Sequence, residues 1–110
     1  MNCQSTQATM NVGLDDRYTG VQKCSTEKYL SILKKVCYSY HVAFSVQVIN
    51  GGFFHEDGRF VEESTLSLTL ADVPEQTILE IAKDLCVFFN QESVMVTFVP
   101  AIVLFVQENL

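Results

Sequence analysis

The sequence has no tryptophan, two prolines, two histidines, and seven basic residues against thirteen acidic ones, which gives a net charge of −6. A nucleic-acid-binding domain usually carries a stripe of lysine and arginine. Here the basic residues are scattered, apart from the pair Lys34–Lys35. The composition therefore argues against nucleic acid and anionic membranes as partners, and leaves a basic protein surface open as a possible partner.

The four cysteines form no CxxC pair, and neither histidine stands at a zinc-finger spacing, so no metal site and no cofactor are predicted. Cys37 and Cys86 lie among apolar residues, which favours free buried thiols over disulfides. No apolar segment precedes Cys3, which predicts a cytoplasmic protein. The alternative is a periplasmic lipoprotein that was trimmed before Cys3 and acylated there.

Long hydrophobic runs are also missing. The longest covers residues 94–106 and is interrupted by Thr97 and Pro100. A membrane-spanning helix needs about 20 apolar residues. This run is instead typical of a buried strand, and no membrane span is expected.

What the sequence does contain is an alternation of strand and helix patterns over one domain of 110 residues, with residues 1–9 expected to be flexible. A first strand is expected from Met10. Residues 25–40 and 74–90 show helical spacing of apolar residues, whereas residues 42–49 and 60–70 alternate as half-buried strands do. The order β-α-β-β-α-β predicts an α+β fold, a ferredoxin-like split sandwich whose antiparallel sheet carries two helices on one face.

The ends of both helices are marked by residues with known preferences. Ser25 or Thr26 suits the N-cap of the first helix, and His41 falls just past its end. Pro74 suits the first position of the second helix, which makes Asp72 or Val73 the cap. Asn90 suits a left-handed residue at the end of that helix.

The stretch GGFFHEDGRFVEES, residues 51–64, reads as a hairpin. Asp57–Gly58 favours a two-residue turn, in which Glu56 would face Arg59. Opposed residue numbers at such a tip sum to an odd number, whereas the apolar faces of the two strands pair even numbers with even numbers. One extra residue must then be absorbed, and Gly51–Gly52 is the expected place for a β-bulge.

Strand parity places Glu62 on the same face as Leu66, Leu68 and Leu70. A carboxylate on a core face needs partners, because burial without them costs several kcal/mol. Glu62 is therefore predicted to be buried and bonded to Gln91 or to the backbone near Glu92. The alternative places Glu62 at the rim, where it meets solvent or pairs with Arg59.

Four residues are candidates for a binding site: His55, Glu62, Gln91 and Glu92. Two carboxylates and an imidazole can carry out acid–base chemistry, although the sequence fixes no distance between them. Gln91 has a second interpretation, which is to tie the helix end to the sheet. The pair Asp15–Asp16 favours a solvated loop over a metal site.

From about Gly52 onward the chain resembles a family of small bacterial α+β proteins of unknown function. An aromatic residue and the Asp57–Gly58 turn precede a strand centred on Glu62, and a helix ends in Phe89 before Gln91–Glu92–Ser93–Val94 and a strand that closes on Phe105. Gly13 corresponds to a glycine after the first strand. The chain departs from the pattern at Val61, where a basic residue is common, and at Asn90, where glycine is common. The resemblance implies the fold and no reaction.

Two functions are compatible with these features. The first is a small acidic, non-enzymatic interaction protein, such as a phage- or plasmid-type inhibitor of a host factor, which self-associates as a dimer or larger oligomer through its sheet. This expectation depends on the last strand, where Met95, Val99, Val103 and Phe105 would lie on a face that no helix covers. The alternative is a small enzyme or ligand binder that uses Glu62, His55 and Gln91.

Overall fold

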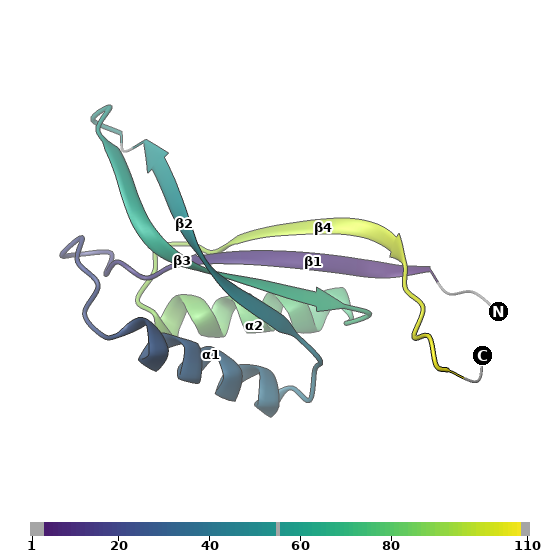
Figure 1. Cartoon of the computed structure of the whole chain (residues 1–110). Coiled ribbons are helices and arrows are strands. Elements are labelled where there is room, and N and C mark those ends of the chain that lie inside the picture. The colour runs from purple at the N-terminus through teal and green to yellow at the C-terminus, as the bar shows by residue number, and fades with distance from the viewer. Residues whose placement is uncertain (1–3, 55, 109–110) are drawn as a thin grey trace.

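The computed structural model describes residues 4–54 and 56–108. Four strands and two helices follow one another as β1 (Gln4–Gly13), α1 (Thr26–Ser39), β2 (Ser45–Phe54), β3 (Phe60–Ala71), α2 (Glu75–Phe88) and β4 (Met95–Ile102). The strands form one antiparallel sheet in the order β2-β3-β1-β4, and both helices lie against the same face of it (Figure 1). This arrangement confirms the predicted ferredoxin-like α+β sandwich.

The core lies between the sheet and the two helices. Alternate residues of the two central strands point into it and are fully buried: Ala8, Met10 and Val12 from β1, and Leu66, Leu68 and Leu70 from β3. Leu33 and Cys37 from α1 and Ile78, Ile81 and Leu85 from α2 cover them. Burial of apolar side chains of this size contributes about 1.5–3 kcal/mol each to the folded state.

The cysteines described by the structure are free thiols; Cys37 is buried as predicted, whereas Cys86 is half-buried. Burial raises the pKa of the Cys37 thiol to about 11. Cys3, the expected acylation site of the lipoprotein alternative, lies outside the described residues.

The first strand starts at Gln4, earlier than expected, and pairs with both β3 and β4. Its N-terminal half alternates polar Gln7 and Thr9 with buried Ala8 and Met10, which is the pattern of a half-buried strand. The polar half of that pattern suggested a flexible terminus, but ladder hydrogen bonds on both sides hold this segment in the centre of the sheet.

Three predictions about helix ends are confirmed. The Ser25 Oγ accepts a hydrogen bond from the Lys28 N–H at 3.1 Å. His41 and Asn90, just past the two helices, have φ angles of 56° and 51°. The predicted cap of α2 is wrong, because Pro74 itself is the N-cap residue and no side chain bonds the helix N-terminus there. Asp72 has a φ of 59° and forms the turn between β3 and α2.

The predicted bulge is also wrong. The β2–β3 register is continuous, with Ser45 opposite Thr69, Gly52 opposite Glu62 and Phe54 opposite Phe60. The strands stop pairing at Phe54 and Phe60, so the connection between them is longer than a two-residue turn. Because Phe54 already faces Phe60, even numbers oppose even numbers along the whole ladder, and no extra residue has to be absorbed.

Gly52 permits a close approach instead of a bulge. A Cβ atom at Gly52 would overlap the ring of Phe60 on the neighbouring strand. The Phe54 and Phe60 rings also contact each other edge to face, with centroids 5.1 Å apart. The glycine therefore lets the aromatic rings pack at the tip of the hairpin.

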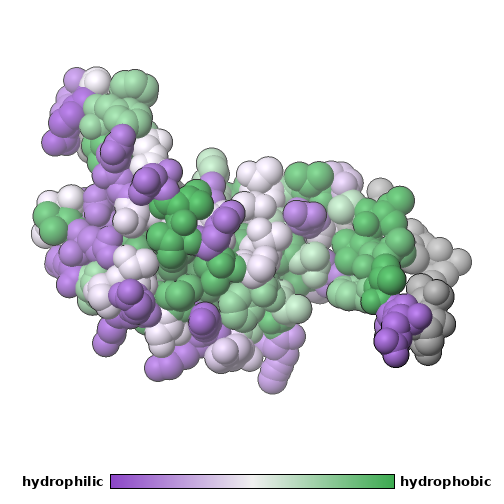
Figure 2. Space-filling model, viewed as in Figure 1, coloured by the Kyte–Doolittle hydropathy of each residue, from purple (hydrophilic) through white to green (hydrophobic). Residues whose placement is uncertain are grey.

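The outer part of the β2–β3 hairpin projects beyond the helices as an arm (Figure 1). The molecule measures 52 × 27 × 25 Å along its principal axes. At the tip of this arm Phe53, Phe54 and Phe60 are 47%, 75% and 51% exposed. Figure 2 shows apolar side chains at the tip and again at the opposite end of the molecule, near the C-terminus.

The sheet face that the helices leave open is mostly polar, contrary to expectation. Thr65 and Ser67 lie at its centre, whereas the exposed apolar residues of β4 on this face are Met95 and Val99. Val94, Val96 and Phe98 pack against the core instead. Val103 and Phe105 follow the end of β4. Among the described helices, none is long and apolar enough to cross a membrane.

Candidate functional site

Neighbouring glutamates at the base of the arm have different environments. The predicted burial of Glu62 is wrong, and the alternative that places it at the rim in contact with solvent is confirmed. Glu62 is exposed, whereas Glu63 is half-buried. Glu62 does share the parity of Leu66 and Leu68, but β3 has already run past the helices at that point, so this side of the strand meets solvent. Arg59 pairs with Asp57 at 3.8 Å.

Glu63 points to the opposite face, where the end of β1 and the loop that follows it enclose its carboxylate. The Glu63 Oε2 accepts a hydrogen bond from the Asp15 N–H at 3.0 Å. The carboxylate lies over Gly13, and a Cβ atom at that position would overlap it. A glycine at the end of β1 is thus what allows the carboxylate to reach the backbone of Asp15.

Gln91 also holds Asp15, through the carbonyl group of that residue. Its Nε2 donates a hydrogen bond to the Asp15 carbonyl at 2.6 Å. The backbone N–H and C=O of Asp15 are therefore fixed by Glu63 from β3 and by Gln91 from the segment after α2. We call Glu63, Asp15 and Gln91 the Glu63 site.

Asp16 anchors the loop that carries Asp15. It is 4% exposed, and its Oδ1 accepts hydrogen bonds from the N–H groups of Tyr18 at 2.9 Å and Thr19 at 3.1 Å. Its Oδ2 accepts one from the Asn90 Nδ2 at 2.6 Å and faces the Lys23 ammonium at 3.6 Å. The hydrogen bond from Asn90, followed by those from the backbone and the charge of Lys23, lowers the pKa of Asp16 to about 2.

The pKa values of the Glu63 and Asp15 carboxyl groups are shifted in the opposite direction, upward. Loss of solvent raises the pKa of Glu63, the nearby charge of Asp15 adds to this, and the Asp15 N–H partly offsets it. Burial likewise raises the pKa of Asp15. A carboxyl group with a raised pKa in a partly enclosed site is suited to proton transfer, and when ionised it can hold a cation.

The four binding-site residues predicted from the sequence do not form one cluster among the described residues. His55 lies outside the described residues. Glu62 and Glu92 are exposed, and Gln91 is half-buried. The structure brings Gln91 to Glu63 through the Asp15 peptide group and does not bring it to Glu62. Within residues 4–54 and 56–108, no group of three or more His, Cys, Asp or Glu side chains could hold a metal ion.

Sequence reasoning missed Glu63. It also assigned Asp15–Asp16 to a solvated loop, which is wrong because Asp15 is half-buried and Asp16 is buried. The available signal was the glycine directly before Leu14–Asp15, because a glycine at a strand end often marks a close approach by another group. Assigning Glu63 to it requires the unbulged register of the hairpin.

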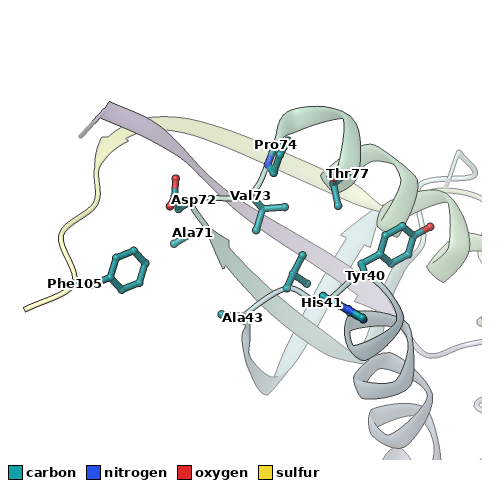
Figure 3. Close-up of a pocket in the computed structure, with 10 residues that line it drawn as sticks. Tyr40, His41, Ala43, Ala71, Asp72, Val73, Pro74, Thr77 and Phe105 are labelled. Atoms are coloured by element: carbon teal, nitrogen blue, oxygen red, sulfur yellow. The ribbon is translucent and has the colours of Figure 1, made fainter. Parts of the chain in front are cut away.

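A separate cavity of about 300 Å³ lies at the other end of the helices. Tyr40 and His41 from the end of α1, Asp72 and Thr77 around the start of α2, and Phe105 from the C-terminal segment line it (Figure 3). The Tyr40 hydroxyl donates a hydrogen bond to the Asp84 Oδ2 at 2.7 Å, which raises the pKa of Tyr40 to about 12.

No family model matches the chain, and no curated protein is similar enough in sequence to match. Solved structures do match. The apo form of a phage SAM lyase has 17% identity and a TM-score of 0.70 over 91% of this chain and 83% of the lyase. A phage SAM lyase in complex with S-methyl-5'-thioadenosine has 17% identity and a TM-score of 0.67 over 84% and 78%. CutA from Synechococcus elongatus has 12% identity and a TM-score of 0.61 over 92% and 80%.

At these identities the likeness concerns the fold. It nevertheless contradicts the expectation of a non-enzymatic interaction protein or inhibitor of a host factor, because the matched folds include that of an enzyme. The findings favour the alternative, in which the chain is a small enzyme or ligand binder.

Proposed function

We propose that this chain is a small enzyme that binds its ligand at the Glu63 site. The observation that carries the proposal is the Glu63 carboxylate, which is half-buried, has a raised pKa and accepts a hydrogen bond from the Asp15 N–H. Burying a carboxylate beside a second carboxylate opposes folding, and such arrangements are concentrated at functional sites. The anchoring of Asp15 by Gln91 gives the site a fixed geometry.

The similarity to the phage SAM lyase suggests the substrate class. S-adenosylmethionine carries a sulfonium cation, and an ionised Glu63 would attract it. In a lyase reaction that yields S-methyl-5'-thioadenosine, a carbon–sulfur bond breaks and its electron pair stays on sulfur. In the same step, either the fragment's own carboxylate attacks that carbon, or the neighbouring carbon gives up a proton and a carbon–carbon double bond forms; in the second case Glu63 would accept that proton.

Three variants test the proposal. The purified protein is incubated with S-adenosylmethionine, and S-methyl-5'-thioadenosine is measured by chromatography. We expect the wild-type protein to form it and Glu63→Gln to be slower by about 100-fold, the usual contribution of an acid–base group. Glu62→Gln is the matched control, since it removes the same charge from the neighbouring exposed residue. Gln91→Ala should slow the reaction less, because Gln91 acts through Asp15.

Three outcomes would contradict the site, the enzymatic activity or the substrate class, respectively. Equal losses in the Glu62 and Glu63 variants would contradict the assignment of the site to Glu63, and would return Glu62 to consideration. Tight binding of S-methyl-5'-thioadenosine without turnover would show that the chain is a ligand binder and not an enzyme. The absence of both binding and turnover would reject the substrate class.

We also propose that the chain self-associates. The exposed rings of Phe53, Phe54 and Phe60 form an apolar arm tip, and Met95 and Val99 expose a second apolar area on β4. Exposed apolar groups of this kind commonly mark protein contacts. The two areas lie on different strands, so a contact between the tip of one copy and β4 of another would be heterologous and could close a ring. A cytoplasmic location remains a prediction from the sequence.

A further inference from the structure

We propose that the cavity between the end of α1 and the start of α2 binds a small organic cation, with Asp72 as its counter-ion and Phe105 as its aromatic wall. This site is separate from the Glu63 site and does not depend on the proposed reaction. Its volume of about 300 Å³ is at the lower end of the range found for small-molecule sites.

The charge of the lining determines the sign of the ligand. Asp72 is the one described lining residue with a formal charge at neutral pH, and none of the described lining residues is lysine or arginine. No hydrogen bond or ion pair occupies the Asp72 carboxylate within the described part of the chain. The whole chain carries a net charge of −6, which also favours the approach of cations.

The shape of the lining determines the kind of cation. Figure 3 shows Phe105 beside Ala71 and Asp72 at one end of the cavity, and Tyr40 and His41 at the other. The walls between them include Val42, Val73 and Pro74. An ammonium group near an aromatic face is attracted by the ring electrons, and a carboxylate beside the ring adds to this attraction. An alkyl-substituted ammonium therefore fits better than an inorganic ion, because its apolar body contacts the walls.

The backbone at Asp72 is consistent with a functional position. Its φ of 59° lies in the left-handed region, which residues other than glycine, asparagine and aspartate seldom adopt. Its carboxylate does not cap α2, although it precedes the helix closely. The turn thus sets the backbone of Asp72 beside the cavity, and its exposed carboxylate remains available to a ligand.

The test uses tert-butylammonium and its neutral isostere tert-butanol as probes, followed in the full chain by amide NMR. We expect saturable shifts at His41, Asp72, Thr77 and Phe105 with tert-butylammonium, and much smaller ones with tert-butanol. Asp72→Asn should weaken binding about three- to tenfold, as expected for the loss of one partly exposed charge pair. Asparagine tolerates the left-handed conformation, so this variant removes the charge without straining the turn.

Matched variants complete the test. Glu56→Gln removes a charge from the exposed hairpin loop and should leave the affinity unchanged. Phe105→Leu keeps an apolar wall but should weaken binding of the cation. Equal affinities for Asp72→Asn and Glu56→Gln, equal shifts with the neutral isostere, or no saturable shift with the wild-type protein would each overturn the proposal.

Discussion

At the scale of single residues, Gly13 and Glu63 form a matched pair. Adding a methyl group at Gly13 would displace the Glu63 carboxylate and break its hydrogen bond to the Asp15 N–H. We expect Gly13→Ala to lower the free energy of unfolding by about 1 kcal/mol, because the lost charge-assisted hydrogen bond exceeds the gain from a stiffer unfolded chain. Urea denaturation measures this change.

A double-mutant cycle tests whether Gly13 and Glu63 act together. In a Glu63→Ala background the carboxylate is gone, so Gly13→Ala should be neutral or slightly stabilising. The same loss from Gly13→Ala in both backgrounds would mean that the glycine serves the backbone and not the carboxylate. This double-mutant cycle also separates the structural role of Glu63 from its role in the proposed reaction.

Residue-scale prediction from the sequence succeeded where local preferences act alone. Ser25 and Asn90 have side chains and backbone preferences that define helix ends, and both positions are confirmed. The choice between Glu62 and Glu63 failed because it depends on how far the helices extend along β3. No local pattern contains that information.

At the scale of elements, Asp16 joins the loop after β1 to the end of α2. Its pKa of about 2 in the folded protein is below the ordinary value of 3.8. A carboxyl group whose pKa is lowered by folding stabilises the protein above its unfolded pKa, and this contribution is lost as the pH falls toward the folded pKa. The loss for Asp16 should therefore occur between about pH 4 and pH 2.

Melting temperatures measured from pH 6 down to pH 2 test this prediction. At pH 6, Asp16→Asn should melt below the wild-type protein, because the substituted side chain would turn an amide toward the amide of Asn90 in place of the carboxylate. The gap should narrow as the pH falls through this window. Glu92→Gln, which removes an exposed carboxylate nearby, should track the wild-type curve. A gap that stays constant down to pH 2 would show that ionisation of Asp16 does not stabilise the loop.

The elements themselves could be predicted because apolar periodicity is strong in α1, α2, β2 and β3. The hairpin connection could not, because Asp57–Gly58 suits a two-residue turn while the strands stop pairing at Phe54 and Phe60. Packing of the two aromatic rings at the tip favours this pairing over the local turn preference. The predicted bulge followed from the wrong turn and fails with it.

At the scale of the whole molecule, the order of elements was sufficient to predict the fold, since few arrangements bury the faces of four strands and two helices. Function was not contained in that order. The similarity to the phage SAM lyase emerged from the arrangement of the chain in space, at an identity of 17%. At this identity the likeness concerns the arrangement of strands and helices, and it does not extend to the residues of a site.

The arm is the feature of the whole molecule that argues for assembly. A projecting hairpin with Phe53, Phe54 and Phe60 exposed would be unfavourable in water unless another surface covers it. We expect light scattering after size-exclusion chromatography at micromolar concentration to give a mass above that of one chain. Phe54→Ser should weaken the assembly by about tenfold or more, as loss of a central aromatic contact does.

Val87→Ser is the matched control, because Val87 is also 75% exposed but lies on α2, away from the arm. A wild-type protein that elutes as a clean monomer would contradict self-association, and equal effects of the two substitutions would remove the arm from the contact.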